Sequence, residues 1–463
     1  MFKSNPGLTE VSSTASFEFG IEGLDQLYPG VLTPGTLLVI AGHPGSGKTT
    51  MAAQLCYANA LKGRRCLYIS TQETEEKFMR FMKRFDFDFE YVTSTGHFKF
   101  SRLPLISSEE AVDSVLESIT SMVLEFKPEI LIIDSITPLT KVITGDVRRR
   151  ALLQNYFYNI AFDIKGVVVL IAEIPLGKTT IEEAGDVEFV ADGIIILRHE
   201  LRNGVVARRM EVRKLRGAPL EVSEVPFTIT AGRGVVALAP PRYEVERRGE
   251  SRRRFNTLCK PLEETIGELM GGEVVLVAGT PYSLTMGRVL EWITRIAYGS
   301  KASLMVISYR GLESDILGVL EGIKSREPAL AGVVEKAAVV SLSLAILSPE
   351  ALISLELEHL SRSKPDIAVI MGIDALKHVY KQNPLLVERL LDVEKQVIRR
   401  LGILTFKISH ITSLDDISWE LPQSDVTIIV GDPVTGVAGG NVIARRMSGG
   451  ELVGPRELLK ECF

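Results

Sequence analysis

The stretch that decides the fold of the first half of this 463-residue chain is AGHPGSGKTT, Ala41–Thr50. Gly42, Gly47, Lys48 and Thr49 satisfy the pattern G-x-x-x-x-G-K-[ST], with an apolar run before it and a helical run after it. This context predicts a strand, a loop that wraps phosphate groups, and a helix whose amino terminus faces them. The alternative interpretation is a glycine-rich turn that holds no ligand.

The residue types of this loop suit a nucleoside triphosphate with magnesium. Glycines at positions 42, 45 and 47 let the backbone approach phosphate oxygens closely enough for its N–H groups to bind them. Lys48 would reach the β- and γ-phosphates and Thr49 would coordinate Mg²⁺, so ATP and Mg²⁺ are the predicted ligands. The predicted nucleotide-binding residues are Gly42, His43, Pro44, Gly45, Ser46, Gly47, Lys48, Thr49 and Thr50.

A second element of a nucleotide site is the run EILIID, which ends in Asp134. An apolar strand that ends in aspartate is common and carries little information alone. Beside a phosphate-binding loop that carboxylate would bind the Mg²⁺ shell, so Thr49 and Asp134 are the predicted metal-site residues. Another stretch, AEIPLGKTT at residues 172–180, follows a later strand and places Pro175 in its loop, so we expect Lys178 to be an ordinary loop residue.

Length and composition predict a globular chain of two domains. A chain of 463 residues exceeds what one hydrophobic core usually supports. With 46% apolar residues, 24% charged residues and a net charge of -5, neither disorder nor general polyanion binding is indicated. The four cysteines form no CxxC or Cys/His cluster, so we expect no zinc site and no disulfide framework, which fits a reducing cytoplasm. No signal peptide or membrane helix is predicted.

Short apolar runs alternate with longer amphipathic segments in both halves of the chain. This order predicts an α/β fold with mostly parallel sheets flanked by helices. The expected strands of the first half are residues 36–41, 64–70, 129–134, 166–173 and 193–200. Those of the second half are residues 273–279, 302–309, 366–373, 402–409 and 426–432.

The two halves repeat one plan at a spacing of 237 residues. The decapeptide AGTPYSLTMG begins at Ala278 and shares Ala, Gly, Pro and Ser with the phosphate loop, and Pro128 and Pro365 keep the same spacing. We therefore predict domains at residues 1–240 and 255–463, joined by an arginine-rich linker at residues 241–254. The arginines of this linker would either contact nucleic acid or a partner, or simply be solvated.

Five motifs of the first half, in order, resemble those of the KaiC branch of the RecA-like ATPases. They are the phosphate loop, YISTQETEEKF, EILIIDSIT, EFVADGIIILRHE, and MEVRKLRG followed by PFTIT. The resemblance covers most of residues 14–230. The second half resembles the same domain in order and spacing but not in motifs, as in the double-domain KaiC-like proteins common in archaea. The resemblance implies two tandem RecA-like P-loop NTPase domains.

The resemblance also implies that ATP lies between adjacent subunits, usually of a hexameric ring. In that family KLRG residues reach the γ-phosphate bound by the neighbour, so Lys214 and Arg216 would act in trans. The alternative is a basic edge strand. Its alternation would put Arg209, Glu211, Arg213 and Leu215 on one face and Met210, Val212, Lys214 and Arg216 on the other.

One departure from the family concerns the general base. Where the family has two adjacent glutamates after the second strand, this chain has Gln72 and Glu73. Glutamine accepts no proton but can position a water, and Glu73 would substitute if the loop shifted. We therefore expect slow hydrolysis. The predicted catalytic residues are Glu73, Gln72, Lys48, Lys214 and Arg216.

The second half has lost the residues that would bind nucleotide. At the constant spacing, Gly45, Gly47, Lys48, Thr49 and Asp134 correspond to Tyr282, Leu284, Thr285, Met286 and Met371. RRMSGG keeps Arg446 but has Ser448 at the place of Arg216. We predict a degenerate domain that is structural or binds a partner. The family's clock protein phosphorylates itself in its second domain, so a circadian oscillator is not predicted.

Three functions remain open from the sequence. The first is an ATPase with slow turnover that acts as a switch through nucleotide-dependent assembly, as a homo-oligomer with an unknown protein partner. The second is a non-hydrolysing scaffold that ATP stabilises. The third is DNA recombination or strand handling, which the net charge and the lack of a basic-aromatic stripe disfavour.

Overall fold

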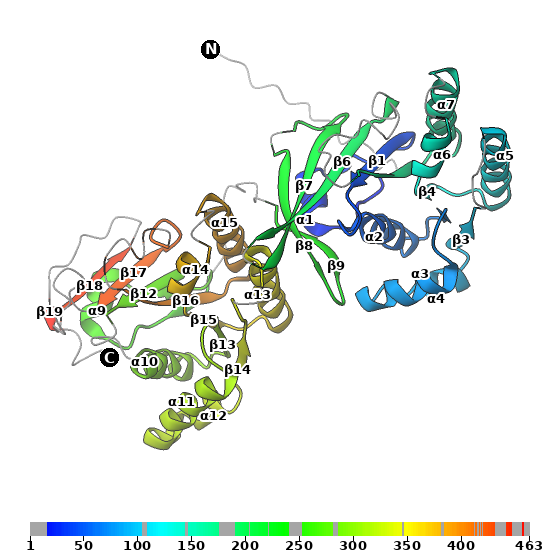
Figure 1. The fold of residues 1–463 in the computed structure, drawn as a ribbon. Helices are drawn as coiled ribbons and strands as arrows, with labels where there is room; N and C mark the ends of the chain where they lie inside the picture. The colour runs from blue at the N-terminus through cyan, green and yellow to red at the C-terminus, as the bar shows by residue number, and fades with distance from the viewer. Residues whose placement is uncertain are drawn as a thin grey trace, which may run out of the picture. The chain divides into compact units, whose positions relative to one another are not determined.

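The computed structural model describes the chain with gaps. The described residues are 16–103, 109–143, 147–175, 190–202, 204–220, 222–239, 252–280, 286–344, 347–380, 384–411, 413, 416, 418, 420–430, 441–446 and 456–457. The chain divides into two compact units, one of Met1–Leu201 with Val206–Ala239 and one of Arg202–Val205 with Pro240–Phe463 (Figure 1). Each unit is described by itself. No described helix is both long enough and apolar enough to cross a membrane.

The first unit is built on one sheet whose described strands run in the order β3-β2-β4-β5-β1-β6-β7-β8-β9. These strands are β1 (Thr36–Gly42), β2 (Cys66–Ser70), β3 (Phe98–Arg102), β4 (Ile130–Asp134), β5 (Val167–Glu173), β6 (Gly193–Arg202), β7 (Val205–Leu215), β8 (Glu224–Thr230) and β9 (Gly234–Ala237). The pairs from β3 to β6 are parallel, and β8 pairs antiparallel with β7 and β9. The carboxyl ends of β1, β2, β4 and β5 therefore share one edge of the sheet.

Helices cover both faces of this sheet. They are α1 (Glu22–Leu27), α2 (Lys48–Ala60), α3 (Glu75–Met82), α4 (Phe89–Ser94), α5 (Glu109–Phe126), α6 (Thr137–Val142) and α7 (Val147–Asp163), with the 3-10 turn η1 (Lys83–Phe85). Leu38 and Ile40 of β1 belong to one core with residues of α2, whereas Leu37 and Val39 belong to another with residues of α5 and α7. Burial on both sides explains why these strands are continuous apolar runs.

The second unit repeats this topology, with its main sheet in the order β14-β13-β15-β16-β12-β17-β18-β19. The strands are β12 (Val274–Gly279), β13 (Leu304–Ser308), β14 (Ala338–Ser341), β15 (Ile367–Met371), β16 (Leu404–His410), β17 (Val426–Val430), β18 (Asn441–Arg446) and β19 (Arg456–Glu457), and β10 (Arg254–Phe255) pairs separately with β11 (Leu269–Met270). Each strand from β12 to β19 takes the place of its counterpart in the first sheet. The structure thus confirms tandem α/β domains with mostly parallel sheets.

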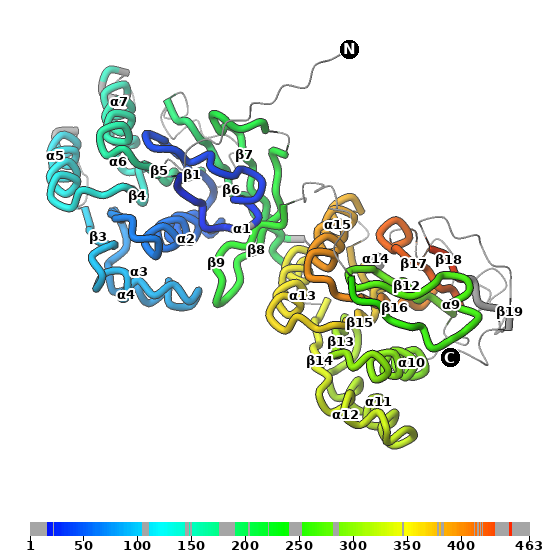
Figure 2. The backbone as a smooth tube through the Cα atoms, turned by 180° about the vertical axis from the view of Figure 1, so that it is seen from behind, coloured from blue at the N-terminus to red at the C-terminus, as the bar shows by residue number. Residues whose placement is uncertain are grey.

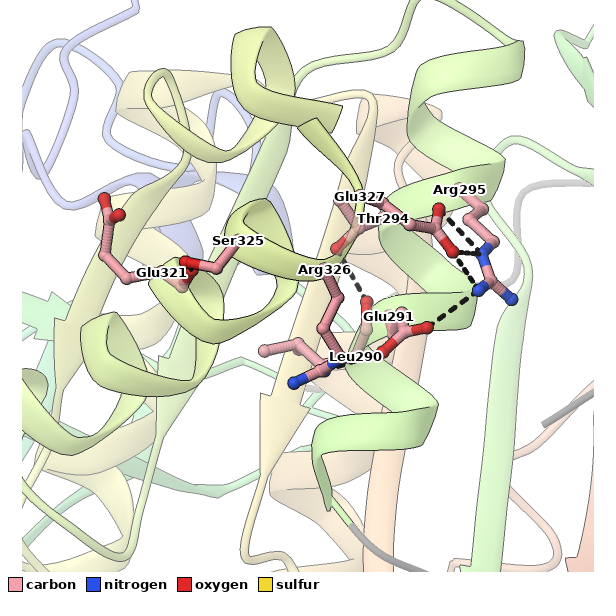
Figure 3. Close-up of polar contacts among 8 residues, drawn as sticks. All are labelled: Leu290, Glu291, Thr294, Arg295, Glu321, Ser325, Arg326 and Glu327. Atoms are coloured by element: carbon pink, nitrogen blue, oxygen red, sulfur yellow. Dashed lines mark hydrogen bonds and ion pairs between the residues drawn. The ribbon is translucent and has the colours of Figure 1, made fainter. Parts of the chain in front are cut away.

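Two groups of helices cover the second sheet (Figure 2). The described helices are α9 (Lys260–Ile266), α10 (Met286–Gly299), α11 (Glu313–Arg326), α12 (Ala331–Val334), α13 (Pro349–Ser363), α14 (Asp374–Val379) and α15 (Pro384–Leu401), with the 3-10 turn η3 (Pro328–Leu330). Ion pairs tie α10 to the end of α11: Arg295 binds Glu291 and Glu327, and Arg326 binds Glu291 (Figure 3). Exposed pairs of this kind contribute little each, so packing of the apolar helix faces carries most of the stability.

One expectation from the sequence is wrong. Cys56 of α2 and Cys66 of β2 form a disulfide, with their Cα atoms 5.9 Å apart. Both residues are buried, and they lie in the same core because α2 packs against β2. The spacing of ten residues matches no cysteine motif, so only the packing of a helix on a strand brings the two thiols together.

Candidate nucleotide-binding site

The loop between β1 and α2 has the backbone that the glycine spacing predicts. Gly45 and Gly47 have φ values of 77° and 103°, a region that residues with a side chain rarely adopt. A Cβ atom on Gly47 would also lie 2.6 Å from Cδ1 of Ile229. α2 begins immediately after this turn, at Lys48, so its free N–H groups face the loop. Local backbone geometry therefore favours an anion at this helix terminus.

Lys48 is held inside the loop. Its Nζ donates a hydrogen bond to the carbonyl of His43 at 3.0 Å, and the side chain is largely buried. Burial lowers the pKa of Lys48, and the nearby carboxylates of Glu173 and Asp134 partly oppose that shift. An anion bound by the loop would oppose this effect of burial, because a nearby negative charge favours the charged form of Lys48.

Thr49 and Asp134 lie together beneath the loop, although 85 residues separate them. The Thr49 hydroxyl donates to Oδ2 of Asp134 at 2.8 Å, and the Tyr68 hydroxyl donates to the same oxygen at 2.6 Å. Burial raises the pKa of Asp134, while the hydrogen bonds from Tyr68 and Thr49 oppose the rise. A hydroxyl and a carboxylate are oxygen ligands of the kind Mg²⁺ prefers, so these residues fit that ion.

Tyr68 is not predicted from the sequence. It lies in the middle of β2, fully buried, and its ring packs against Phe78 and Phe100. A buried tyrosine in an otherwise apolar strand needs a partner for its hydroxyl, and that requirement is the only signal the sequence carries. The hydroxyl fixes the orientation of the Asp134 carboxylate.

The remaining loop residues differ in exposure. Pro44 is exposed, whereas Ser46 is fully buried and its Oγ has no hydrogen-bond partner among the described residues. The His43 ring is held by a contact of 3.0 Å between Nδ1 and the carbonyl of Ile174. A buried hydroxyl without a partner is costly, so Ser46 has hydrogen-bonding capacity to offer a ligand of the loop.

Gln72 and Glu73 follow β2, where their backbone N–H groups donate to the Ser70 hydroxyl at 3.3 and 2.9 Å. Glu73 forms an ion pair of 2.8 Å with Lys77 one turn later in α3. Gln72 instead points to the carboxylate of Glu173, with a distance of 3.5 Å from Nε2 to Oε1. Glu173, the last residue of β5, is a site residue that the sequence-based prediction did not include.

Arg216 lies far from the phosphate loop of its own chain. Arg216 donates to Oδ1 of Asp192 at 2.9 Å, and Oδ2 of Asp192 accepts the N–H of Leu37 at 3.0 Å. Leu37 is at the amino end of β1, five residues before Gly42, so roughly 16 Å of strand separates Arg216 from the loop. The side chain of Arg216 remains 57% exposed.

The expected alternation of β7 holds only in part. Met210 and Val212 are buried in the core as predicted, and Arg213 is exposed on the other side. Leu215, however, is buried in the same core as Met210 and Val212 rather than sharing the face of Arg213, so that prediction is wrong. The strand ends at Leu215, where the pleat no longer dictates the direction of the side chain.

The equivalent edge of the second sheet carries no metal ligand at the place of Asp134. β15 ends in the largely buried Met371, which pairs in register with Ser308 as Asp134 pairs with Ser70. Met286, the predicted counterpart of Thr49, is the first residue of α10. The predicted counterparts Tyr282, Leu284, Thr285 and Ser448, the stretch with Lys178, and residues 241–251 of the linker lie outside the described residues.

Comparisons with known proteins show which family the first half of the chain resembles. The family model of the KaiC ATPase matches residues 17–242. Residues 17–242 thus form a KaiC-like ATPase domain. Circadian clock protein KaiC3 of Synechocystis sp. is 25% identical over 286 residues, which cover 58% of this chain and 55% of that protein. Circadian clock oscillator protein KaiC of Picosynechococcus sp. is 24% identical over 237 residues, which cover 51% and 45%.

The chain thus spans about half the length of the curated relatives it matches. The KaiC family model ends at residue 242, near the boundary between the two compact units. The match therefore covers the first unit, and the likeness of the second unit to the first comes from its strand order.

Proposed function

We propose that this KaiC-family chain is a slow ATPase that acts as a switch through nucleotide-dependent assembly. The observation that carries the proposal is the arrangement of Lys48, Thr49 and Asp134 around one glycine-rich turn. Lys48 would bind the β- and γ-phosphates, and Thr49 and Asp134 would hold Mg²⁺, which neutralises charge on the transferring phosphoryl group. Residues suited to binding phosphate and to holding the metal thus lie close together around this turn.

Slow turnover is proposed because Gln72 stands where the family has a glutamate. An amide cannot take the proton of an attacking water, and Glu73, the nearest carboxylate in sequence, is paired with Lys77. Loss of a general base typically lowers a rate by about 10² to 10⁴. ATP would therefore remain bound long enough for its presence to define a state of the protein.

Assembly is proposed because Arg216 is too distant to serve the loop of its own chain. The exposed Arg216 guanidinium would instead reach the γ-phosphate held by a neighbouring copy, in a ring that we propose to be hexameric. Positive charge supplied in this way stabilises the transition state and couples hydrolysis to assembly. The second domain, with Met371 at the metal position, would not bind nucleotide and would offer a surface to a protein partner.

The test combines MgATP binding with molar mass. Calorimetric titration should show MgATP binding by the wild type and its loss in Lys48→Ala, and light scattering should show a larger assembly when MgATP is present. Lys62→Ala, which changes an exposed lysine just beyond the carboxyl end of α2, is the matched control for folding. A wild type that binds no nucleotide would overturn the proposal, and a monomer at saturating MgATP would overturn the trans role of Arg216.

A further inference from the structure

We propose that Glu173 orients and activates the attacking water, in place of the glutamate that Gln72 replaces. The inference rests on the ATPase function proposed above, and it assigns the catalytic base of that reaction to a residue on a different strand. Its basis is the contact of Glu173 with Gln72 and its place beside the first residue of the phosphate loop. Gln72 becomes a positioning residue for this carboxylate.

The fold places Glu173 at the edge of the phosphate loop. It ends β5, the parallel neighbour of β1, and its backbone is paired in register with Gly42, where the loop begins. Its N–H donates to the Thr137 hydroxyl at 2.9 Å, which fixes the end of the strand. The carboxylate therefore projects from a rigid element rather than from a mobile loop, as precise positioning of a reacting group requires.

The charge of Glu173 acts directly on the lysine of the loop. Among the carboxylates that favour the charged form of Lys48, Glu173 has a larger effect than Asp134. Lys48 is the residue that would contact the γ-phosphate. Because Glu173 is also paired in register with the first glycine of the loop, its carboxylate lies on the side of the sheet where the loop would hold the γ-phosphate and where an attacking water must lie.

Gln72 complements Glu173 in a way that a glutamate would not. The amide Nε2 lies 3.5 Å from Oε1 of Glu173, which is a long hydrogen bond. A neutral donor at this position orients the carboxylate and leaves its other oxygen for water. A glutamate here would place two carboxylates side by side, and their repulsion would raise the pKa of one of them.

Glu73 is poorly placed for the same task. Its carboxylate is paired with Lys77 at 2.8 Å within the first turns of α3, and its N–H is bound by the Ser70 hydroxyl. To activate water, Glu73 would have to break the ion pair and turn away from the helix. Glu173 needs no such rearrangement, because its contact with Gln72 uses Oε1 alone.

The proposed step balances without a further reactant. The water oxygen forms a bond to the γ-phosphorus while the bond from that phosphorus to the β–γ bridging oxygen breaks, and ADP leaves with the electron pair. The proton of the water passes to Glu173 and then to solvent. Inorganic phosphate is the second product.

The first experiment replaces the carboxylate by its amide. Glu173→Gln should bind MgATP within about threefold of the wild-type affinity by calorimetry, while turnover falls by about 10² to 10⁴. Protein incubated with MgATP, desalted and denatured should release ATP from this variant and ADP from the wild type. Glu76→Gln, which changes an exposed glutamate in the first turn of α3, is the matched control, and its turnover should stay within about twofold of the wild-type value.

The second experiment exchanges the two residues. Gln72→Glu combined with Glu173→Gln returns the carboxylate to the family position, and it should recover turnover relative to Glu173→Gln alone. Normal turnover in Glu173→Gln, or an exchange variant as inactive as Glu173→Gln, would overturn the role of Glu173. A wild type that binds MgATP but never converts it to ADP would also overturn that role. A wild type that binds no MgATP would overturn the proposed function itself.

Discussion

The second unit contains a buried ionic network whose disruption should be measurable as a loss of stability. Lys407 Nζ of β16 donates to Oε2 of Glu394 of α15 at 2.6 Å, and their side chains are 2% and 0% exposed. The Tyr309 hydroxyl donates to Oε2 of Glu356 of α13. Oε1 of Glu356 and Oε1 of Glu394 have no other partner in the described part of the chain, so a proton on Glu356 shared with Glu394 would satisfy both oxygens.

The first unit has an apolar core at the corresponding positions. Leu170, Phe157 and Ile119, each 237 residues before Lys407, Glu394 and Glu356, are all buried in one hydrophobic cluster. The same fold therefore tolerates apolar side chains in this layer. At these positions the ionic network occurs in the second unit and not in the first. Apolar substitutions in the network should therefore fit the fold of the second unit.

Lys407→Met should strongly destabilise the second unit, because it leaves the Glu394 carboxylate buried without its cation. Breaking a buried pair in this way costs about 3–5 kcal/mol. Lys407→Met combined with Glu394→Met removes both charges, and apolar replacement of a whole buried pair is often neutral or stabilising by about 1–4 kcal/mol. The double variant should thus be more stable than the single one by at least about 3 kcal/mol.

Urea unfolding followed by tryptophan fluorescence measures this difference in the full chain. Both tryptophans, Trp292 and Trp419, belong to the second half of the sequence, and Trp292 is buried in the core of that unit. Lys395→Met, which removes a lysine paired with Asp425 at 3.1 Å nearer the surface, is the matched control. A single variant with the wild-type midpoint, or a double variant less stable than the single one, would refute the reasoning.

Three further outcomes are expected. Burial holds the pKa of Glu356 well above its ordinary value of 4.5. The stability that this protonated group contributes is therefore complete below pH 4.5 and declines as the pH rises, by at most about 1.4 kcal/mol per pH unit. Urea unfolding measured across this pH range should show the decline in the wild type and not in Glu356→Gln. Tyr68→Phe removes a hydrogen bond to Asp134, so thermal unfolding should show a loss of about 1–2 kcal/mol, and calorimetry should show weaker Mg²⁺-dependent ATP binding. Arg216→Ala should retain MgATP binding but lose about 10³-fold in steady-state turnover, and unchanged turnover would exclude a trans finger.

Motifs and strands could be predicted from sequence because their signals are local. The phosphate loop is a contiguous run with glycines at fixed places, and fully buried strands such as β1 and β4 are continuous apolar runs. The edge strand β3 was not predicted, since Phe98 and Phe100 alternate there with more exposed residues over only five positions. A short, half-buried strand at the edge of a sheet carries too weak a pattern to be recognised alone.

Sequence by itself determined that the chain contains two copies of one α/β plan, that the first has a phosphate loop, and that Lys48, Thr49 and Asp134 are candidates for its chemistry. Tertiary structure decided which other residues meet there. Glu173 lies beside Gln72 across 101 residues, Tyr68 holds Asp134 across 66, and Arg216 lies at the opposite end of β1 from the loop. The physical reason is that parallel strands bring their carboxyl ends to one edge whatever their separation along the chain, and strand order follows from the packing of whole elements.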